Sequence, residues 1–168
     1  MRSIFLAAII ATHCNLGFAD DISWTKKAAE HYNLPPLSDY LQAASSNPRA
    51  LLEVAKRCSA LLGSSAWALS HLNGLSDDDP QILDLNKMHE DLRQISFRVH
   101  VQAIRGTELN QDTYTESVIK VDPDIHDYQT QYFGRQHRNH DKEATLIEND
   151  PLLQDEVFAC VGMHEQLR

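Results

Sequence analysis

The chain lacks the short motifs that mark common catalytic and cofactor sites. It contains no Gly-x-Ser-x-Gly, His-Glu-x-x-His or Gly-Lys-Ser/Thr sequence, no Cys-x-x-Cys-His for covalent haem attachment, and no pair of Glu-x-x-His motifs for a di-iron site. Each of these motifs holds a nucleophile, a metal ligand or a phosphate-binding backbone in a fixed geometry. Without them no nucleophile and base can be assembled from the sequence, so we predict that the protein is not an enzyme and assign no catalytic residue.

A long apolar run is also missing. The most apolar segment, Ile4–Ala11, is too short to span a membrane as a helix, which needs about 20 apolar residues. It follows a single positive charge at Arg2 and precedes a small-x-small cleavage pattern that ends at Ala19. We therefore predict a cleaved signal peptide at residues 1–19, a single mature domain at 20–168, a periplasmic or secreted location, and no membrane insertion after cleavage.

Positive charge is scarce in this chain. It has 15 Lys and Arg residues against 24 Asp and Glu residues, a formal net charge of −9, and cleavage after Ala19 would remove one Arg and no acidic residue. A chain with this balance repels nucleic acids and anionic lipid surfaces. We therefore expect no nucleic-acid partner. The hydrophobic content of 42% is too high for a disordered chain, so we expect a folded domain with its own core.

Cysteine is rare, and the few cysteines present predict one disulfide. Of the three, Cys14 would leave with the signal peptide, and Cys58 and Cys160 would remain. A single pair has only one possible connectivity, and an oxidising compartment favours its formation. We predict a disulfide between Cys58 and Cys160 that joins two helices, with two free buried thiols as the alternative.

The period-two alternation of a β-sheet is absent, and the prolines predict helices instead. Asn and Asp are favoured N-caps, and Pro is favoured at the first helical position. An apolar pattern with spacings of three and four residues follows each Asn-Pro or Asp-Pro pair. Four of the six prolines predict helix starts in this way: Asn47-Pro48, Asp79-Pro80, Asp122-Pro123 and Asp150-Pro151.

These helices predict an all-α fold. We expect an antiparallel bundle of about four main helices, because the connections between them are short. Two shorter helices are expected to precede the bundle, around residues 23–32 and 37–45. Near Pro123 the apolar pattern continues across the proline, which predicts either two nearly collinear helices or one kinked helix.

Two histidines one helical turn apart suggest a metal site. His137 and His140 can share a divalent transition-metal ion, with Asp141 or the upstream His126 as a further ligand. Three basic residues beside this pair would repel a cation, and a solvated basic helix end is the alternative interpretation. We therefore expect no cofactor, and a divalent metal at these histidines is the alternative.

Several small or polar residues within the apolar faces predict packing. His89 and His164 are expected to be buried and hydrogen bonded to backbone carbonyls. A stripe of small residues lets neighbouring helices approach closely, and it consists of Ser59, Gly63, Ala66 and Ser70. Three tyrosines share one predicted helix face, Tyr114, Tyr128 and Tyr132. They predict either a ligand groove or a core rim with the hydroxyl groups in water.

The sequence leaves three functional hypotheses in order of preference. The first is an exported, non-enzymatic binding or interaction protein, such as a chaperone-like, inhibitor or immunity factor, with a protein or peptide partner. The alternative is an exported metal- or haem-binding bundle that uses His137 and His140. The last is an enzyme of a type that the sequence does not reveal.

Overall fold

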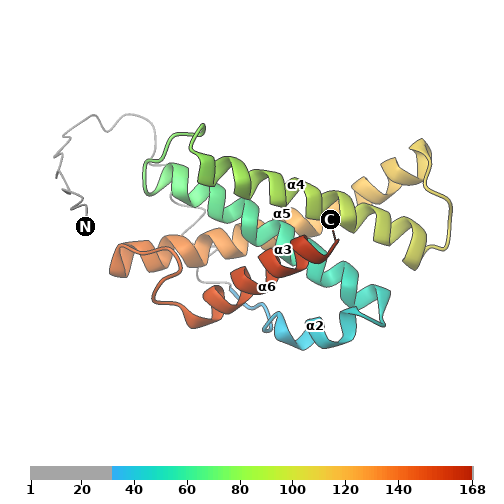
Figure 1. The fold of residues 1–168 in the computed structure, drawn as a ribbon, viewed down its shortest axis with the longest axis horizontal. Coiled ribbons are helices and arrows are strands. Elements are labelled where there is room, and N and C mark those ends of the chain that lie inside the picture. Colours follow the sequence, from blue (N-terminus) through green and yellow to red (C-terminus); the bar gives the residue numbers. More distant parts are fainter. Residues whose placement is uncertain (1–31, 168) are drawn as a thin grey trace.

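The computed structural model describes residues 32–167, so the predicted signal peptide and residues 23–31 of the first predicted helix lie outside the described part of the chain. Within residues 32–167 the fold is all-α, with five α-helices, one π-helical turn and no strand. In chain order the elements are α2 (Ser38–Ala44), α3 (Pro48–His71), α4 (Pro80–Val99), η1 (His100–Ile104), α5 (Gln111–Glu143) and α6 (Pro151–Leu167). This arrangement confirms the predicted helical bundle (Figure 1).

Three of the four proline pairs begin helices as predicted. The side chain of Asn47 accepts a hydrogen bond from the Arg49 backbone N–H at 3.0 Å, directly before Pro48. Asp79 accepts from the Gln81 backbone N–H at 2.9 Å in the same way. The carboxylate of Asp150 accepts from a backbone N–H in the first turn of α6 at 3.2 Å. These side chains satisfy backbone donors that have no partner inside the helix.

The fourth pair does not begin a helix. Pro123 lies inside α5, a single helix that runs without interruption from Gln111 to Glu143. The N-cap of the helix is instead Asn110, whose side chain accepts from the Thr113 backbone N–H while the Thr113 hydroxyl accepts from the Asn110 backbone N–H. This reciprocal capping satisfies two backbone donors at once, and it lies 13 positions before the proline.

Helix α3 is the centre of the bundle rather than one of several equal members. It packs against all four of the other α-helices, and every residue from Val54 to Ala66 is buried. Figure 1 shows α3 in the middle of the assembly with the other helices around it. The apolar pattern of this segment predicted a single buried face, whereas a helix that is buried all round must also bury its polar residues.

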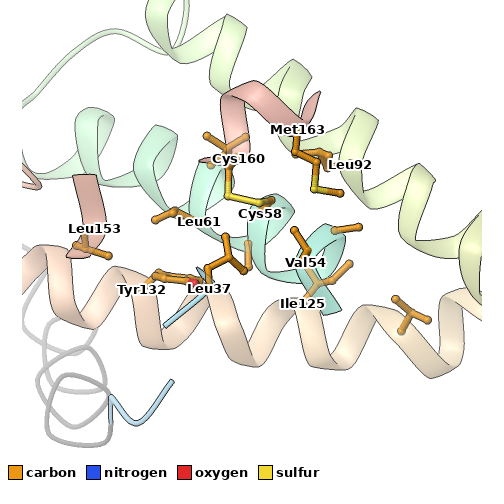
Figure 2. Close-up of a cluster of buried hydrophobic side chains, with 14 of the residues drawn as sticks. Leu37, Val54, Cys58, Leu61, Leu92, Ile125, Tyr132, Leu153, Cys160 and Met163 are labelled. Atoms are coloured by element: carbon orange, nitrogen blue, oxygen red, sulfur yellow. A yellow bond between two sulfur atoms is a disulfide. The ribbon is translucent and has the colours of Figure 1, made fainter. Parts of the chain in front are cut away.

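The predicted disulfide joins α3 to α6. Cys58 and Cys160 are bonded, with a Cα–Cα distance of 5.0 Å, and both residues are 0% exposed. Figure 2 shows the bond at the centre of the apolar core, close to Leu92 and Met163. The bond therefore closes a long loop from inside the core, where neither sulfur is accessible to solvent.

No helix within residues 32–167 has both the length and the apolar character needed to cross a membrane.

Candidate ligand-binding groove

A groove lies over α3, between α4 and α5. It consists of two adjoining hollows with volumes of about 430 Å³ and 600 Å³. His89 from α4 and His126 and Gln129 from α5 line both hollows, so they mark the junction between them. Because α4 and α5 each pack closely on α3 but touch one another little, the space between them stays open.

Gly63 of α3 allows the groove to form at its floor. A Cβ atom at this position would lie 2.5 Å from the Gln129 Nε2 and 2.9 Å from the His89 Nδ1. Both distances are too short for any side chain to fit without moving its neighbours. The close approach of neighbouring helices that the small residues predicted is therefore confirmed at Gly63. There, one side chain from α4 and one from α5 contact the same point of α3.

His89 is held in one orientation by the backbone of α3. Its Nδ1 lies 2.8 Å from the Ser59 carbonyl oxygen, and the Ser59 hydroxyl donates to the His89 carbonyl oxygen at 3.0 Å. Since a carbonyl oxygen only accepts, Nδ1 carries a hydrogen, and in the uncharged form of the ring the lone pair is therefore on Nε2. This confirms the predicted bond from His89 to a backbone carbonyl, but the residue is half-buried rather than buried as predicted.

The other edge of the His89 ring is available to the groove. The ring lines both hollows, and its Nδ1 edge is turned toward α3. Its Nε2 has no hydrogen-bond partner among residues 32–167. The groove therefore contains a fixed hydrogen-bond acceptor, and a bound molecule with an N–H or O–H group can donate to it.

Ser59 and His89 resemble a nucleophile and base by distance but do not act as one. The Ser59 Oγ lies 2.9 Å from the His89 Nδ1, yet Ser59 is 0% exposed and gives its hydrogen to the His89 carbonyl. A substrate atom cannot reach this hydroxyl without unpacking α4 from α3. The pair therefore positions the imidazole and performs no nucleophilic step.

Aromatic side chains line the first hollow. Trp67 packs edge-on against Phe133 with ring centroids 4.0 Å apart, and the His71 ring stacks on Trp67 at 3.9 Å. Both Trp67 and Phe133 line the hollow, and Ile82 adds an aliphatic surface. The other lining residues are mostly polar, and a hollow that combines an apolar wall with polar groups is usual for a small-molecule site.

The second hollow contains a closed ion pair. The Arg93 guanidinium donates to both oxygens of the Asp122 carboxylate, at 2.6 Å and 2.9 Å. These hydrogen bonds lower the pKa of Asp122 below its ordinary value and raise the pKa of Arg93. The charges neutralise one another, so the hollow presents no strong net charge to a ligand.

The predicted metal ligands are not brought together as one site. His126 lies eleven positions before His137 on the same helix, a rise of about 16 Å. His137 is 6% exposed, and its Nδ1 lies 3.8 Å from an oxygen of Asp141. His140 is half-buried. Within residues 32–167 no three histidine, cysteine or acidic side chains converge on a point that could hold a metal ion.

His164 differs from the prediction in its partner. The side chain is buried, but its Nε2 lies 2.9 Å from an oxygen of Asp91 on α4 rather than from a backbone carbonyl. The reason is the position of α6, which crosses α4 next to the disulfide and brings His164 to the acidic side chain. This contact ties the C-terminal helix to α4.

The three tyrosines have different partners, and none of them lines the groove. The Tyr114 hydroxyl donates to Gln94, the Tyr128 hydroxyl donates to Glu53, and the Tyr132 hydroxyl donates to Glu156. The predicted rim with its hydroxyl groups in water is therefore wrong, because each hydroxyl group is bonded to another side chain.

A buried polar network surrounds Arg57, and no sequence pattern predicted it. Arg57 is 1% exposed and Glu156 is 3% exposed, and the Arg57 Nη2 donates to a Glu156 oxygen at 2.9 Å. The guanidinium also donates to the Tyr132 hydroxyl at 2.8 Å and 3.0 Å and to the Pro35 carbonyl at 2.6 Å. The Glu156 carboxylate accepts in turn from the Leu37 backbone N–H at 2.9 Å. We call these five residues the closed network.

The closed network has a structural role. Burial raises the pKa of Tyr132 well above its usual range, so its hydroxyl group stays protonated and donates to Glu156 at 2.7 Å. Each charged group meets several partners, which is the condition under which buried charges are tolerated. The network fastens the segment before α2 to α3, α5 and α6. No motif could have revealed it, since its members are far apart in the sequence.

Comparisons of the chain with models of protein families, with curated proteins and with solved structures found no match.

Proposed function

We propose that this is an exported, non-enzymatic binding protein that holds a small molecule in the groove between α4 and α5. The observation that carries the proposal is the fixed His89 ring, which lines both hollows and whose Nε2 has no hydrogen-bond partner within residues 32–167. A lone acceptor that is locked in place by the backbone and left without a partner is suited to fix the orientation of a ligand.

The size and lining of the groove support a small molecule rather than a protein. The first hollow, at about 430 Å³, lies within the range of roughly 300–1,000 Å³ that is usual for small-molecule sites. Its wall combines the aromatic rings of Trp67 and Phe133 with nine polar residues. The ligand that fits this lining best has a planar apolar body and one N–H or O–H group that donates to the His89 Nε2.

The hydroxyl groups of Ser59 and of the lining residues Ser64, Ser70 and Thr130 all donate hydrogen bonds within the fold, which supports binding without chemistry. Both cysteines of the described chain are in the disulfide, and the Ser59 hydroxyl is buried. The Ser64 hydroxyl, which also belongs to the lining, donates to the Leu61 carbonyl at 2.8 Å. Besides the His89 ring, the polar side chains of Asn86, His126 and Gln129 line the first hollow and can meet a ligand.

The disulfide supports export. Cysteine pairs of this kind persist in oxidising compartments and are rare in reducing ones. The pair that bonds is the pair that would remain after cleavage at Ala19. Expression with and without residues 1–19, followed by fractionation and N-terminal sequencing, tests this part: a mature chain that begins at Asp20 in the exported fraction is expected, and an uncleaved cytosolic chain would contradict it.

The ligand is tested directly on untagged protein. A library of small aromatic compounds with and without a donor group is screened by ligand-observed NMR, and hits are titrated by calorimetry. We expect saturable binding of donor-bearing compounds that Trp67→Ala weakens by about tenfold or more, while Phe158→Ala on the far, exposed side of α6 leaves it unchanged. Compounds that bind the original protein and the Trp67→Ala variant with the same affinity would contradict the proposed site.

A further inference from the structure

The groove carries matching polar side chains on its two walls. Asn86 and His89 lie one helical turn apart on α4, and His126 and Gln129 lie one turn apart on α5. Residues three positions apart share one face of a helix. Because all four residues line the first hollow, a molecule in it has polar groups on both sides.

These four side chains differ in their bonding from the rest of the polar lining. The other five polar residues of the first hollow bond to groups of the fold, and they are Ser64, Ser70, His71, Asp77 and Thr130. Within residues 32–167 the side chains of Asn86, His126 and Gln129 have no hydrogen-bond partner, and the His89 ring is bonded through its Nδ1 alone. A ligand therefore finds unpaired donors and acceptors at these four positions.

Gln129 and His89 lie side by side over Gly63 of α3. The position that a Cβ atom would take at Gly63 is 2.5 Å from the Gln129 Nε2 and 2.9 Å from the His89 Nδ1. The Gln129 amide can both donate and accept, and the Nε2 of the uncharged His89 ring accepts. Because the two side chains meet at one point of α3, one edge of a ligand can contact both of them.

Solvent reaches the unpaired atoms of both side chains. The side-chain atoms that are buried without a hydrogen-bond partner within residues 32–167 belong to Tyr32, Gln136 and Thr145. His89 and Gln129 are half-buried, and none of those buried atoms is theirs. Since both residues line the two hollows, a molecule in the groove can reach the His89 Nε2 and the Gln129 amide.

The charges of the groove favour a neutral ligand. Among residues 32–167 the lining of the first hollow includes no Lys or Arg, and its one carboxylate is that of Asp77. In the second hollow the Arg93 guanidinium is already paired with Asp122. A phosphate or carboxylate group would lose its hydration here and find no unpaired Lys or Arg in return. The rings of Trp67 and Phe133 form a wall that suits a planar molecule.

We propose that the ligand of the groove is a neutral, planar nitrogen heterocycle with a ring N–H donor beside an acceptor, as in cyclic amides and nucleobases. The N–H donates to the His89 Nε2, and the neighbouring acceptor receives a hydrogen bond from the Gln129 amide. Side-chain amides recognise nucleobases through paired donor and acceptor atoms of this kind. The inference rests on the function proposed for the groove and adds a second contact, at Gln129.

The test compares three ligands of similar shape on the oxidised mature chain. Indole has a ring N–H donor and no ring acceptor, 7-azaindole has both side by side, and 1-methyl-7-azaindole keeps only the acceptor. Titration followed by NMR should show that 7-azaindole binds about five- to tenfold tighter than either of the other two, because one hydrogen bond is worth about this factor.

Substitution of Gln129 tests the second contact. Gln129→Met has a similar volume and no amide, so the preference for 7-azaindole over indole should disappear while indole still binds. Gln131→Met is the matched control and should keep the preference, since Gln131 accepts from the Asn33 backbone N–H and lines neither hollow. A preference that survives Gln129→Met would overturn the role of Gln129. Circular dichroism and indole binding report whether the variant is folded, and the comparison of ligands on the original protein stands without it.

The outcomes separate this inference from the proposed function. If indole and 7-azaindole bind with equal affinity and Trp67→Ala weakens both, the inference is overturned and the proposed function stands. The same holds if none of the three ligands binds while other aromatic compounds from the screen do. If no compound of either set binds saturably, both the inference and the proposed function are overturned.

Discussion

Two polar regions packed against α3 use their polar side chains in opposite ways. The closed network around Arg57 is buried, and its charged groups bond to several partners at once. In the groove, the Nδ1 edge of the His89 ring is bonded to α3, whereas its Nε2 has no hydrogen-bond partner within residues 32–167. Where every polar atom is satisfied, the residues stabilise the fold. Where a polar side chain is held in place but keeps one atom without a hydrogen bond, we propose that this atom binds a ligand.

The largest effect is expected from the disulfide, which joins α3 to α6, the two helices that carry Arg57 and Glu156 of the closed network. Changing Cys58 and Cys160 together to Ala should lower the free energy of unfolding by roughly 4–5 kcal/mol, because the bond closes a loop with a sequence separation of 102. Chemical denaturation of oxidised, reduced and doubly substituted protein measures this. If the substituted protein were as stable as the oxidised one, the disulfide would have no structural role in the bundle.

The next effect should come from the closed network itself. Arg57→Met leaves the Glu156 carboxylate buried without its ion-pair partner, so we expect a loss of about 3–5 kcal/mol in unfolding free energy. The double change of Arg57 and Glu156 to Met is the matched control, and it should cost less than the single change because no charge is left buried. Equal stability of the single variant and the original protein would contradict the account of this region.

On the groove side the sharpest structural test is Gly63. Gly63→Ala puts a methyl group against His89 and Gln129 and should destabilise by about 1–3 kcal/mol. Gly162 of α6 is the control, since a Cβ there meets nothing within 4 Å, and Gly162→Ala should stabilise the helix by about 0.5–1 kcal/mol. Thermal unfolding compares the two, and changes of the same sign would show that Gly63 is not needed for close approach.

The smallest effects are expected from two Arg–Asp ion pairs that differ in their exposure to solvent. Arg135–Asp150 has side chains 16% and 9% exposed, whereas Arg93–Asp122 beside the groove has side chains 26% and 37% exposed. Asp150→Asn should cost roughly 1–3 kcal/mol because a buried Arg loses its partner. Asp122→Asn should cost no more than about 1 kcal/mol because water screens the pair. A larger loss of unfolding free energy for Asp122→Asn than for Asp150→Asn would contradict this expectation.

The pH dependence follows from the same two carboxylates. In Asp122 the bonds from Arg93 lower the pKa, and in Asp150 burial raises the pKa but the bonds from Arg135 and Asn139 outweigh it. A lowered pKa in the folded state means stability that is present above the unfolded pKa, about 4, and is lost as the pH falls through the folded value. Acid denaturation should therefore be less steep in Asp150→Asn.

Local features of the sequence were sufficient to predict the helices and the disulfide. Asn47 and Asp79 act on backbone groups two positions away, so their capping role follows from the sequence alone. Asp122 next to Pro123 has the same local pattern, but it pairs with Arg93 of α4, and α5 continues through both residues. That outcome depends on packing, which a local pattern does not contain.

The two polar regions were beyond the reach of local patterns. Arg57 and Glu156 are separated by 99 positions, and a charged residue in a helix is ordinarily exposed. His89 and Ser59 are 30 positions apart, and their bonds run through backbone carbonyls that any residue possesses. The small-residue stripe predicted a close approach at Gly63, but the identity of the approaching side chains required the packing of three helices.

His89→Asn tests the central claim most directly. The Asn side chain can still donate to the Ser59 carbonyl, as Nδ1 does, but it has no atom in the place of Nε2. Unfolding free energy and affinity for a ligand identified by the screen are measured on the same sample. The account predicts a change in stability within about 0.5 kcal/mol and a loss of affinity of about tenfold. Unchanged affinity, or a collapse in stability like that of Arg57→Met, would contradict it.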